Sequence, residues 1–246
     1  MWLGLGGFGI VFIAACIILA VAYVRRKSPP TFREISSFAR LRRGVGRAVE
    51  DGRRLHVALG HGNLTTPQSG ADFAGLSMLS RLAELTSASD QPPIATSGDA
   101  ALSLLSQDTL QAAGQIASRG VYEATNSRLT GLSPFSYAAG ALPVIRDENV
   151  STNVLIGHFG LEAALLTDAA DRENAFALAA SDNLAAQAVM YASSQDTLIG
   201  EEVFAAGAYV DAGPFHAASL TAQDILRWII IGLMVFGALL KLVGLL

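Results

Sequence analysis

Four short stretches of the 246-residue chain place polar side chains directly after an apolar run. The residues that could carry chemistry there are His61, Asn63, Ser97, Asp99, His158, Ser181 and Asp182. Imidazole titrates near neutral pH, so the two histidines and two aspartates could bind a metal or move a proton. These seven residues are our candidate ligand-binding crevice.

The same residue types also have an ordinary structural use. Aspartate, serine and asparagine just before a helix accept hydrogen bonds from free backbone N–H groups. A histidine after a strand can simply be a turn residue. Both interpretations stay open, and caps and turns are the commoner case.

Standard catalytic motifs are missing from the sequence. It contains no phosphate loop, no H-E-x-x-H, no C-x-x-C and no G-x-S-x-G. "GLGGFG", from Gly4 to Gly9, matches a dinucleotide fingerprint, but no strand can precede it and an apolar run follows. We therefore name no catalytic residue, metal ligand or cofactor, and the pattern favours a protein that is not an enzyme.

Strands and helices alternate around the candidate residues. Short apolar runs followed by helical stretches predict a Rossmann-like α/β domain with a mostly parallel sheet. Four sequence pieces occur twice in the same order, including "SQDTL" at 106–110 and 194–198. We expect a domain over 55–220 built from two diverged β-α-β-α repeats, about 55–145 and 150–220. His61 would then correspond to His158, and Asp108 to Asp196.

Both ends of the chain are apolar enough to cross a membrane. Residues 2–24 contain no charge, and residues 225–246 contain only Arg227 and Lys241, near the ends of the stretch. About 20 apolar residues span a bilayer core. We predict a transmembrane helix over each stretch, the second started by a capping box in "TAQD" at 221–224.

Charge is divided sharply between two parts of the chain. Residues 25–54 hold ten lysines and arginines against three acids, whereas residues 55–224 hold five arginines and eighteen acids. Basic residues beside a span stay in the cytoplasm. We expect a protein of the cell inner membrane with a cytoplasmic central domain and both termini outside. Its acidic body disfavours nucleic acid as a partner.

The basic juxtamembrane segment, 25–54, raises three further expectations. Arg25, Arg26 and Lys27 should meet anionic lipid headgroups of the bilayer. Residues 32–43 form one apolar helical face, which either packs on the domain or lies on the membrane. "GVGRAVEDG" at 44–52 is glycine-rich and predicts a hinge or helix break.

The stretch "GRAVEDGRRLHVALGHG" after one span, with a second span at the other end, resembles an uncharacterised family of bacterial two-span membrane proteins. The resemblance implies no activity and no site residues. Two functions remain. The first is an assembly or structural subunit, a scaffold that forms a homo-oligomer or joins a larger membrane complex. The second is a membrane-tethered ligand-binding domain or enzyme that uses the crevice.

Overall fold

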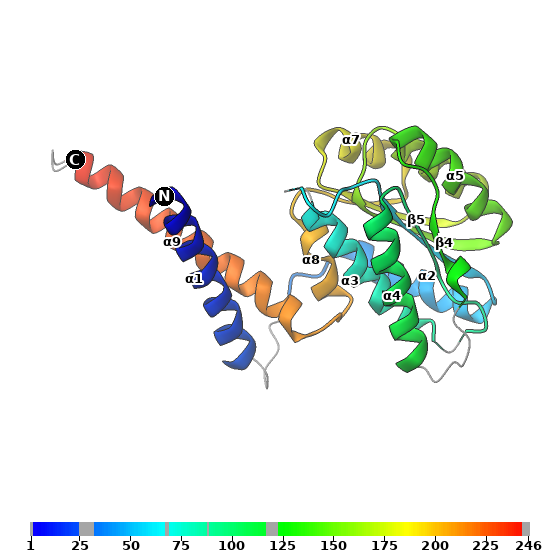
Figure 1. Ribbon diagram of the computed structural model, residues 1–246, viewed down its shortest axis with the longest axis horizontal. Helices are drawn as coiled ribbons and strands as arrows, with labels where there is room; N and C mark the ends of the chain where they lie inside the picture. The colour runs from blue at the N-terminus through cyan, green and yellow to red at the C-terminus, as the bar shows by residue number, and fades with distance from the viewer. Residues whose placement is uncertain (1, 25–31, 67–68, 88, 117–122, 243–246) are drawn as a thin grey trace. The chain divides into compact units, whose positions relative to one another are not determined.

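A computed structural model of the chain describes residues 2–24, 32–66, 69–87, 89–116 and 123–242 (Figure 1). It divides into two compact units, each described separately below. The helical unit comprises Met1–Arg33 and Gly213–Leu246, and the α/β unit comprises Glu34–Ala212. The expected lipid contacts of Arg25, Arg26 and Lys27 lie outside the described residues.

The α/β unit is built on a six-stranded sheet in which every neighbouring pair is parallel. Its strands are β1 (Arg54–Gly60), β2 (Ile94–Ser97), β3 (Ser127–Leu129), β4 (Val150–His158), β5 (Phe176–Ser181) and β6 (Asp196–Leu198). Their order across the sheet is β3-β2-β1-β4-β5-β6. The predicted α/β class with a parallel sheet is confirmed, and this order is that of doubly wound folds.

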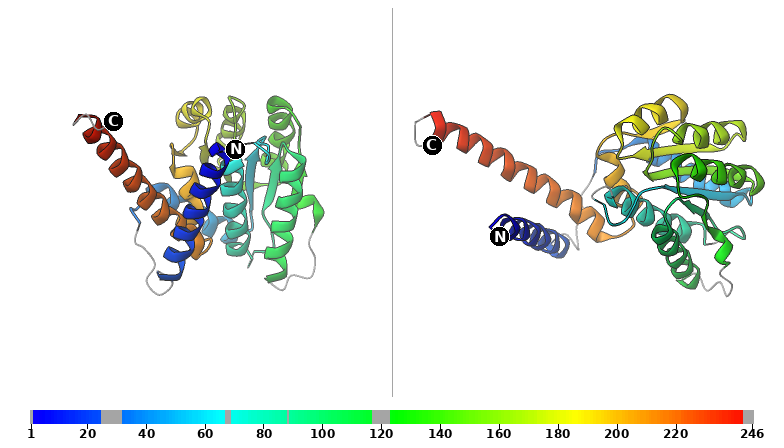
Figure 2. Two further views of the ribbon diagram at one scale, coloured as in Figure 1. Left: turned by 60° about the vertical axis from the view of Figure 1, so that its left-hand side comes forward. Right: turned by 45° about the horizontal axis from the view of Figure 1, so that its top comes forward.

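Helices cover both faces of the sheet (Figure 2). One face carries α2 (Ser36–Glu50), α3 (Ser69–Leu85), α4 (Ala100–Ile116) and α8 (Glu202–Tyr209). The other carries α5 (Pro134–Asp147), α6 (Ala163–Arg172) and α7 (Leu184–Ser193). A short 3₁₀ turn, η2 (Ala124–Asn126), precedes β3.

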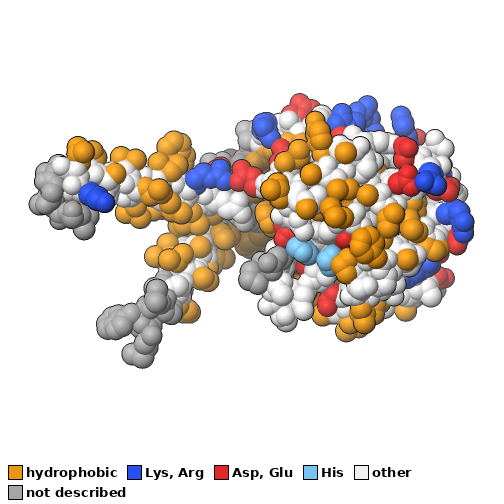
Figure 3. Space-filling view, turned by 90° about the horizontal axis from the view of Figure 1, so that it is seen from above, with side chains coloured by type: hydrophobic (Ala, Val, Ile, Leu, Met, Phe, Trp, Pro, Cys, Tyr) orange, Lys and Arg blue, Asp and Glu red, His pale blue; other side chains and the backbone are white. Residues whose placement is uncertain are grey.

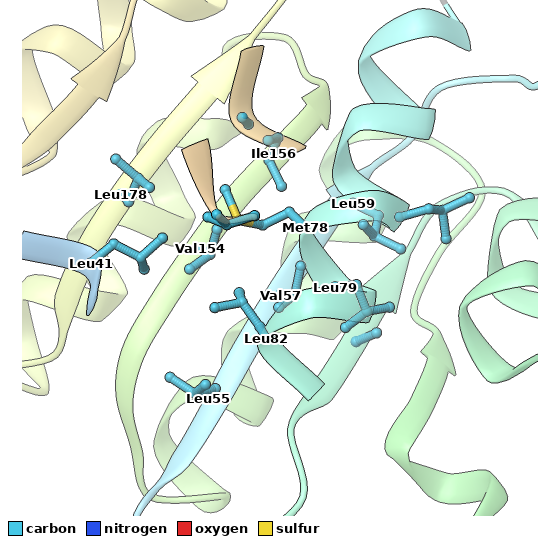
Figure 4. Close-up of a cluster of buried hydrophobic side chains, with 14 of the residues drawn as sticks. Leu41, Leu55, Val57, Leu59, Met78, Leu79, Leu82, Val154, Ile156 and Leu178 are labelled. Carbon is cyan, nitrogen blue, oxygen red and sulfur yellow. The ribbon is translucent and has the colours of Figure 1, made fainter. Parts of the chain in front are cut away.

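The core shows why these strands read as continuous apolar runs. Alternate residues of a strand point to opposite faces, and here both faces are buried. In β1, Val57 and Leu59 pack against the face that carries α3, while Ala58 packs against the other face. Figure 4 shows the first cluster, in which Leu79 and Leu82 of α3 lie over the central strands.

The helical unit contains two long apolar helices, α1 (Trp2–Val24) and α9 (Pro214–Leu242). By length and composition both could cross a membrane, since each contains an 18-residue stretch of high mean hydropathy, 2.6 in α1 and 2.1 in α9. Within this unit they pack together and run in opposite directions, so the start of α1 and the end of α9 lie at the same end (Figure 1). The "GLGGFG" stretch is helical.

The structure tests two predictions about helix boundaries. α2 runs unbroken through Gly44 and Gly46 but ends at Glu50, so the predicted helix break falls at the end of "GVGRAVEDG", where Gly52 has φ +62°. The second prediction, a helix start at "TAQD", is wrong. α9 begins at Pro214, so "TAQD" lies inside the helix, where the Thr221 hydroxyl donates to the Ala217 carbonyl. For α2, the alternative in which it packs on the domain holds, because Phe38 and its apolar face are buried in the core.

The proposed equivalence of the two "SQDTL" segments is also wrong. The first segment lies in α4, whereas the second leads from the end of α7 into β6. Asp108 is therefore helical, while Asp196 begins a strand and its buried carboxylate accepts hydrogen bonds from Ser37 and Arg40. The duplication of the domain as a whole stays a prediction.

Candidate functional site

The candidate site lies where the strand order reverses. β1 and β4 are neighbours at the centre of the sheet, but the helix after β1, α3, packs on one face and the helix after β4, α6, packs on the other. The two connections therefore leave the carboxyl ends of the strands in opposite directions. In doubly wound sheets this divergence opens the ligand-binding crevice.

Two glycines let the ends of β1 and β4 approach closely. Gly60 has φ +77°, and a Cβ there would lie 2.2 Å from the His158 carbonyl oxygen. A Cβ on Gly157 would lie 2.1 Å from the Leu59 carbonyl oxygen. Only glycine fits at these positions. The backbone N–H of His61 then donates to the His158 carbonyl at 3.1 Å.

This approach brings the two histidines together. The rings of His61 and His158 meet edge to face with centroids 5.5 Å apart. Their side chains are 17% and 24% exposed, so both reach solvent. Figure 3 shows histidine atoms at one place on the surface of the α/β unit, with acidic atoms beside them.

Each histidine has its own carboxylate. His158 Nδ1 lies 2.7 Å from Asp182 Oδ1 in a hydrogen bond, and His158 Nε2 has no hydrogen-bond partner among the described residues. His61 Nε2 lies 2.9 Å from Glu162 Oε1, as an ion pair rather than an aligned hydrogen bond. Asp182 thus fixes one imidazole and leaves its second nitrogen for a ligand.

Glu162 changes the titration of His61. Contact with this carboxylate holds the pKa of His61 above its ordinary value, although burial opposes the shift. Burial would raise the pKa of Glu162, but His61 and the Gly160 N–H, which donates at 2.7 Å, outweigh burial and keep that pKa low. Both shifts favour the charged form of the pair, an imidazolium beside a carboxylate.

Asp72, at the start of α3, is the most unusual group of the crevice. It is fully buried, and its Oδ1 accepts the His158 backbone N–H at 3.1 Å. Its Oδ2 has no partner within the described part of the chain. Burial, with smaller contributions from Asp182 and Asp99, raises the pKa of Asp72 to about 6. This carboxyl can exchange a proton near neutral pH.

His56 shows by contrast how a purely structural histidine is held. It is fully buried in β1, with Nδ1 2.7 Å from Asn153 Oδ1 and Nε2 2.9 Å from Thr96 Oγ1. Burial lowers its pKa to about 4. Both of its nitrogens are occupied, whereas His61 and His158 are partly exposed and incompletely bonded.

The remaining predicted residues serve as caps and turns. Asn63 Oδ1 accepts the Thr65 N–H in a turn, and Asp99 Oδ1 accepts the Leu102 N–H at the start of α4. The Ser97 hydroxyl donates to the Asp99 carbonyl oxygen. The Ser181 hydroxyl accepts backbone N–H groups from Phe159 and Asn183. Of the seven predicted residues, the structure thus groups His61, His158 and Asp182.

Asp72 and Glu162 were not predicted from the sequence. A signal for Asp72 existed, since it lies four and seven residues before Leu76 and Leu79, on the buried stripe of α3. Its neighbour Phe73, although apolar, is 50% exposed and lies off that stripe. Glu162 follows β4 by four residues and gave no comparable pattern.

The cluster combines basic imidazoles with a larger number of carboxyl groups. Two imidazoles face Asp72, Glu162 and Asp182, with Asp99 near enough to affect Asp72. Within the described ranges, no three or more His, Cys, Asp or Glu side chains are arranged to hold a metal ion. The groups can accept hydrogen bonds, bind a cation or transfer a proton.

Comparison with known proteins gives one match. A family model described as a domain of unknown function, DUF6754, matches residues 6–246. No curated protein and no solved structure matches the chain. Because the family model covers both apolar helices and the whole α/β unit, the chain belongs to the DUF6754 family of unknown function.

Proposed function

We propose that this protein is a membrane-anchored α/β module that binds a small ligand in the crevice between β1 and β4. One observation carries this proposal. Two histidines and three carboxylates from four separate segments converge at the switch point, and Asp72 is buried there with one oxygen unpartnered among the described residues. Burying an incompletely bonded carboxyl costs stability, which favours a functional role.

The charge of the crevice indicates the class of ligand. Even with both histidines protonated, Glu162, Asp182, Asp99 and an ionised Asp72 leave an excess of negative charge. A pyrophosphate would be repelled, so the dinucleotide chemistry common in this strand order is disfavoured. A ligand that presents an amine or several hydroxyls would instead donate to the carboxylates and to His158 Nε2.

The proposal is tested by identifying the small molecules that stay bound to the protein through purification. The full chain and a His61→Ala/His158→Ala variant are purified from the same host, denatured, and the released small molecules are identified by mass spectrometry. A compound with amine or hydroxyl groups should be released by the wild type and be absent from the variant. Identical profiles from two folded proteins would contradict ligand binding in the crevice.

We further propose the cellular arrangement of the protein. α1 and α9 would cross the inner membrane of a bacterial cell, with the α/β unit in the cytoplasm and both termini outside. The distribution of basic residues supports this orientation, as does the antiparallel packing of α1 and α9, whose outer ends lie together.

A scaffold role in a homo-oligomer or membrane complex is the second candidate. Four glycines of the two apolar helices support this candidate. A Cβ on Gly7, Gly9, Gly232 or Gly237 would meet nothing within 4 Å. These glycines are therefore not used in the packing of α1 against α9 within one chain, and they offer close approach to other helices.

This second candidate has a separate test. Replacing Gly7 and Gly237 by leucine should shift the particle to smaller species in mild detergent, as measured by light scattering after gel filtration. Gly114→Leu, at another open helical glycine in α4, is the matched control. A monomeric wild type, or a double variant of native size, would contradict assembly through these helices.

A further inference from the structure

A hollow in the surface of the α/β unit lies at the opposite end of the sheet from the two histidines. It has a volume of about 350 Å³ and is lined by α2, the turn after it, and the first residues of β4 and β5. Four arginines line it, namely Arg40, Arg43, Arg47 and Arg53. Among the described residues of the lining, Asp51 is the only acid. This local excess of positive charge contrasts with the acidic composition of the rest of the α/β unit.

The geometry of α2 concentrates these arginines. Positions 40, 43 and 47 are three and four residues apart, so they form one stripe of the helix. Phe38, Leu41 and the other apolar residues of α2 form a different face, which is buried in the core. The helix is therefore held firmly by one face while the arginine stripe borders the hollow.

Two of the four arginines are fixed and two are free. Arg40 pairs with the buried Asp196, and Arg53 donates to Asn149 Oδ1 and to the Val150 carbonyl oxygen. Arg43 and Arg47 make no hydrogen bond or ion pair with the described residues, although both line the hollow. Protein partners thus hold two guanidinium groups of the site in place, and the other two have unused donors.

Two residues that line the hollow also carry buried hydroxyl groups without partners. Thr152 is 1% exposed, and neither its Oγ1 nor Ser151 Oγ has a partner within the described residues. α2 packs closely on this threonine at Gly44, where a Cβ would lie 3.0 Å from Thr152 Oγ1 and 3.3 Å from Phe176. Buried hydroxyls without partners are rare, because each loses its hydrogen bonds to water on folding.

We infer that this hollow is a binding site for a phosphate group. Guanidinium groups bind phosphate through two parallel N–H donors, and Arg43 and Arg47 have these donors free. A hollow of about 350 Å³ is of the size that holds a small ligand. The phosphate belongs either to the headgroup of an anionic lipid or to a soluble phosphorylated compound. The site is independent of the acidic crevice.

The two sources are separated by a titration of the full chain in nonionic detergent. The probes are dihexanoylphosphatidylglycerol, dihexanoylphosphatidylcholine and pyrophosphate, and the readout is the shift in thermal unfolding temperature with concentration. A shift with phosphatidylglycerol alone assigns a lipid headgroup, whereas a shift with pyrophosphate assigns a soluble phosphate. In either case Arg43→Gln/Arg47→Gln should weaken binding of that probe at least tenfold.

Two further variants make the result specific. Arg146→Gln/Arg172→Gln removes the same charge from exposed positions elsewhere and should bind like the wild type. Thr152→Val removes a buried hydroxyl of a lining residue without changing the volume; because this hydroxyl is shielded from solvent, the variant should stay folded and bind like the wild type. The inference is overturned if neither phosphatidylglycerol nor pyrophosphate shifts the wild type. It is also overturned if Arg43→Gln/Arg47→Gln binds as tightly as the wild type, or if the control weakens equally.

Discussion

Asp72 is the residue on which the crevice depends most. Its carboxyl is fully buried, accepts one backbone N–H from His158, and has an oxygen without a partner among the described residues. Gly62 leaves the space for it, because a Cβ on Gly62 would lie 2.1 Å from Asp72 Oδ2. A group held in this way lowers the stability of the fold when it is ionised.

Replacing Asp72 by asparagine should therefore stabilise the protein above pH 6. Burial raises the pKa of Asp72 to about 6 in the folded chain, from about 4 when unfolded. The folded state binds the extra proton between these values, so the contribution of Asp72 to stability falls as pH rises through this window. Denaturation at pH 8 should show a gain of about 3 kcal/mol, since each pKa unit corresponds to about 1.4 kcal/mol.

The pH dependence of the gain distinguishes the removal of a buried charge from a stabilising effect of asparagine that does not depend on pH. At pH 2, which is below the pKa of Asp72 in both states, the variant should gain little over the wild type. Asp108→Asn is the control, because Asp108 is exposed in α4 and its replacement removes no buried charge. A variant at Asp72 that is less stable than the wild type at pH 8 would contradict the account.

At the level of residues, the sequence predicts three of the five members of the cluster. His61, His158 and Asp182 follow apolar runs, and the ends of neighbouring parallel strands necessarily meet at one edge of the sheet. Asp72 and Glu162 belong to the segments after the strands, and their positions depend on how α3 and α6 diverge from the sheet. That divergence follows from strand order, which the sequence alone did not specify.

The close approach of the ends of β1 and β4 is the structural feature that brings His61 beside His158. Gly60→Ala should destabilise the protein by about 3 kcal/mol or more, because the new Cβ would meet the His158 carbonyl oxygen and φ is +77°. Gly52→Ala is the matched control, with φ +62° but nothing within 4 Å, and should cost about 1 kcal/mol. Urea denaturation compares them. Equal costs would mean that the approach of β1 to β4 is not essential.

The sequence predicts the strands at the centre of the sheet, where nearly every residue is buried, but not the two strands at its edges. β1, β2, β4 and β5 are buried and apolar. β3 and β6 have three residues each, with the polar sequences "SRL" and "DTL". The two identical "SQDTL" segments differ in structure because their surroundings differ. In α4 Leu110 packs into the core, whereas in β6 Asp196 is bound by Ser37 and Arg40 of α2.

At the scale of the whole molecule, the chain begins and ends in the helical unit, with the α/β unit between the two apolar helices. The proposed orientation predicts that protease added to intact cells or spheroplasts leaves residues 34–212 uncleaved, because the bilayer excludes it. Permeabilised cells are the control and should show cleavage. Cleavage within this range from outside intact cells would contradict a cytoplasmic α/β unit.

The central claim is that the switch-point crevice binds a small ligand. The most direct test is a high-resolution image of the full chain purified in mild detergent from its native membrane. The account predicts non-protein density within hydrogen-bond distance of His158 Nε2 and of Asp72 or Glu162. A well-resolved crevice that contains only water, unchanged in a His61→Ala/His158→Ala variant apart from the missing rings, would contradict it.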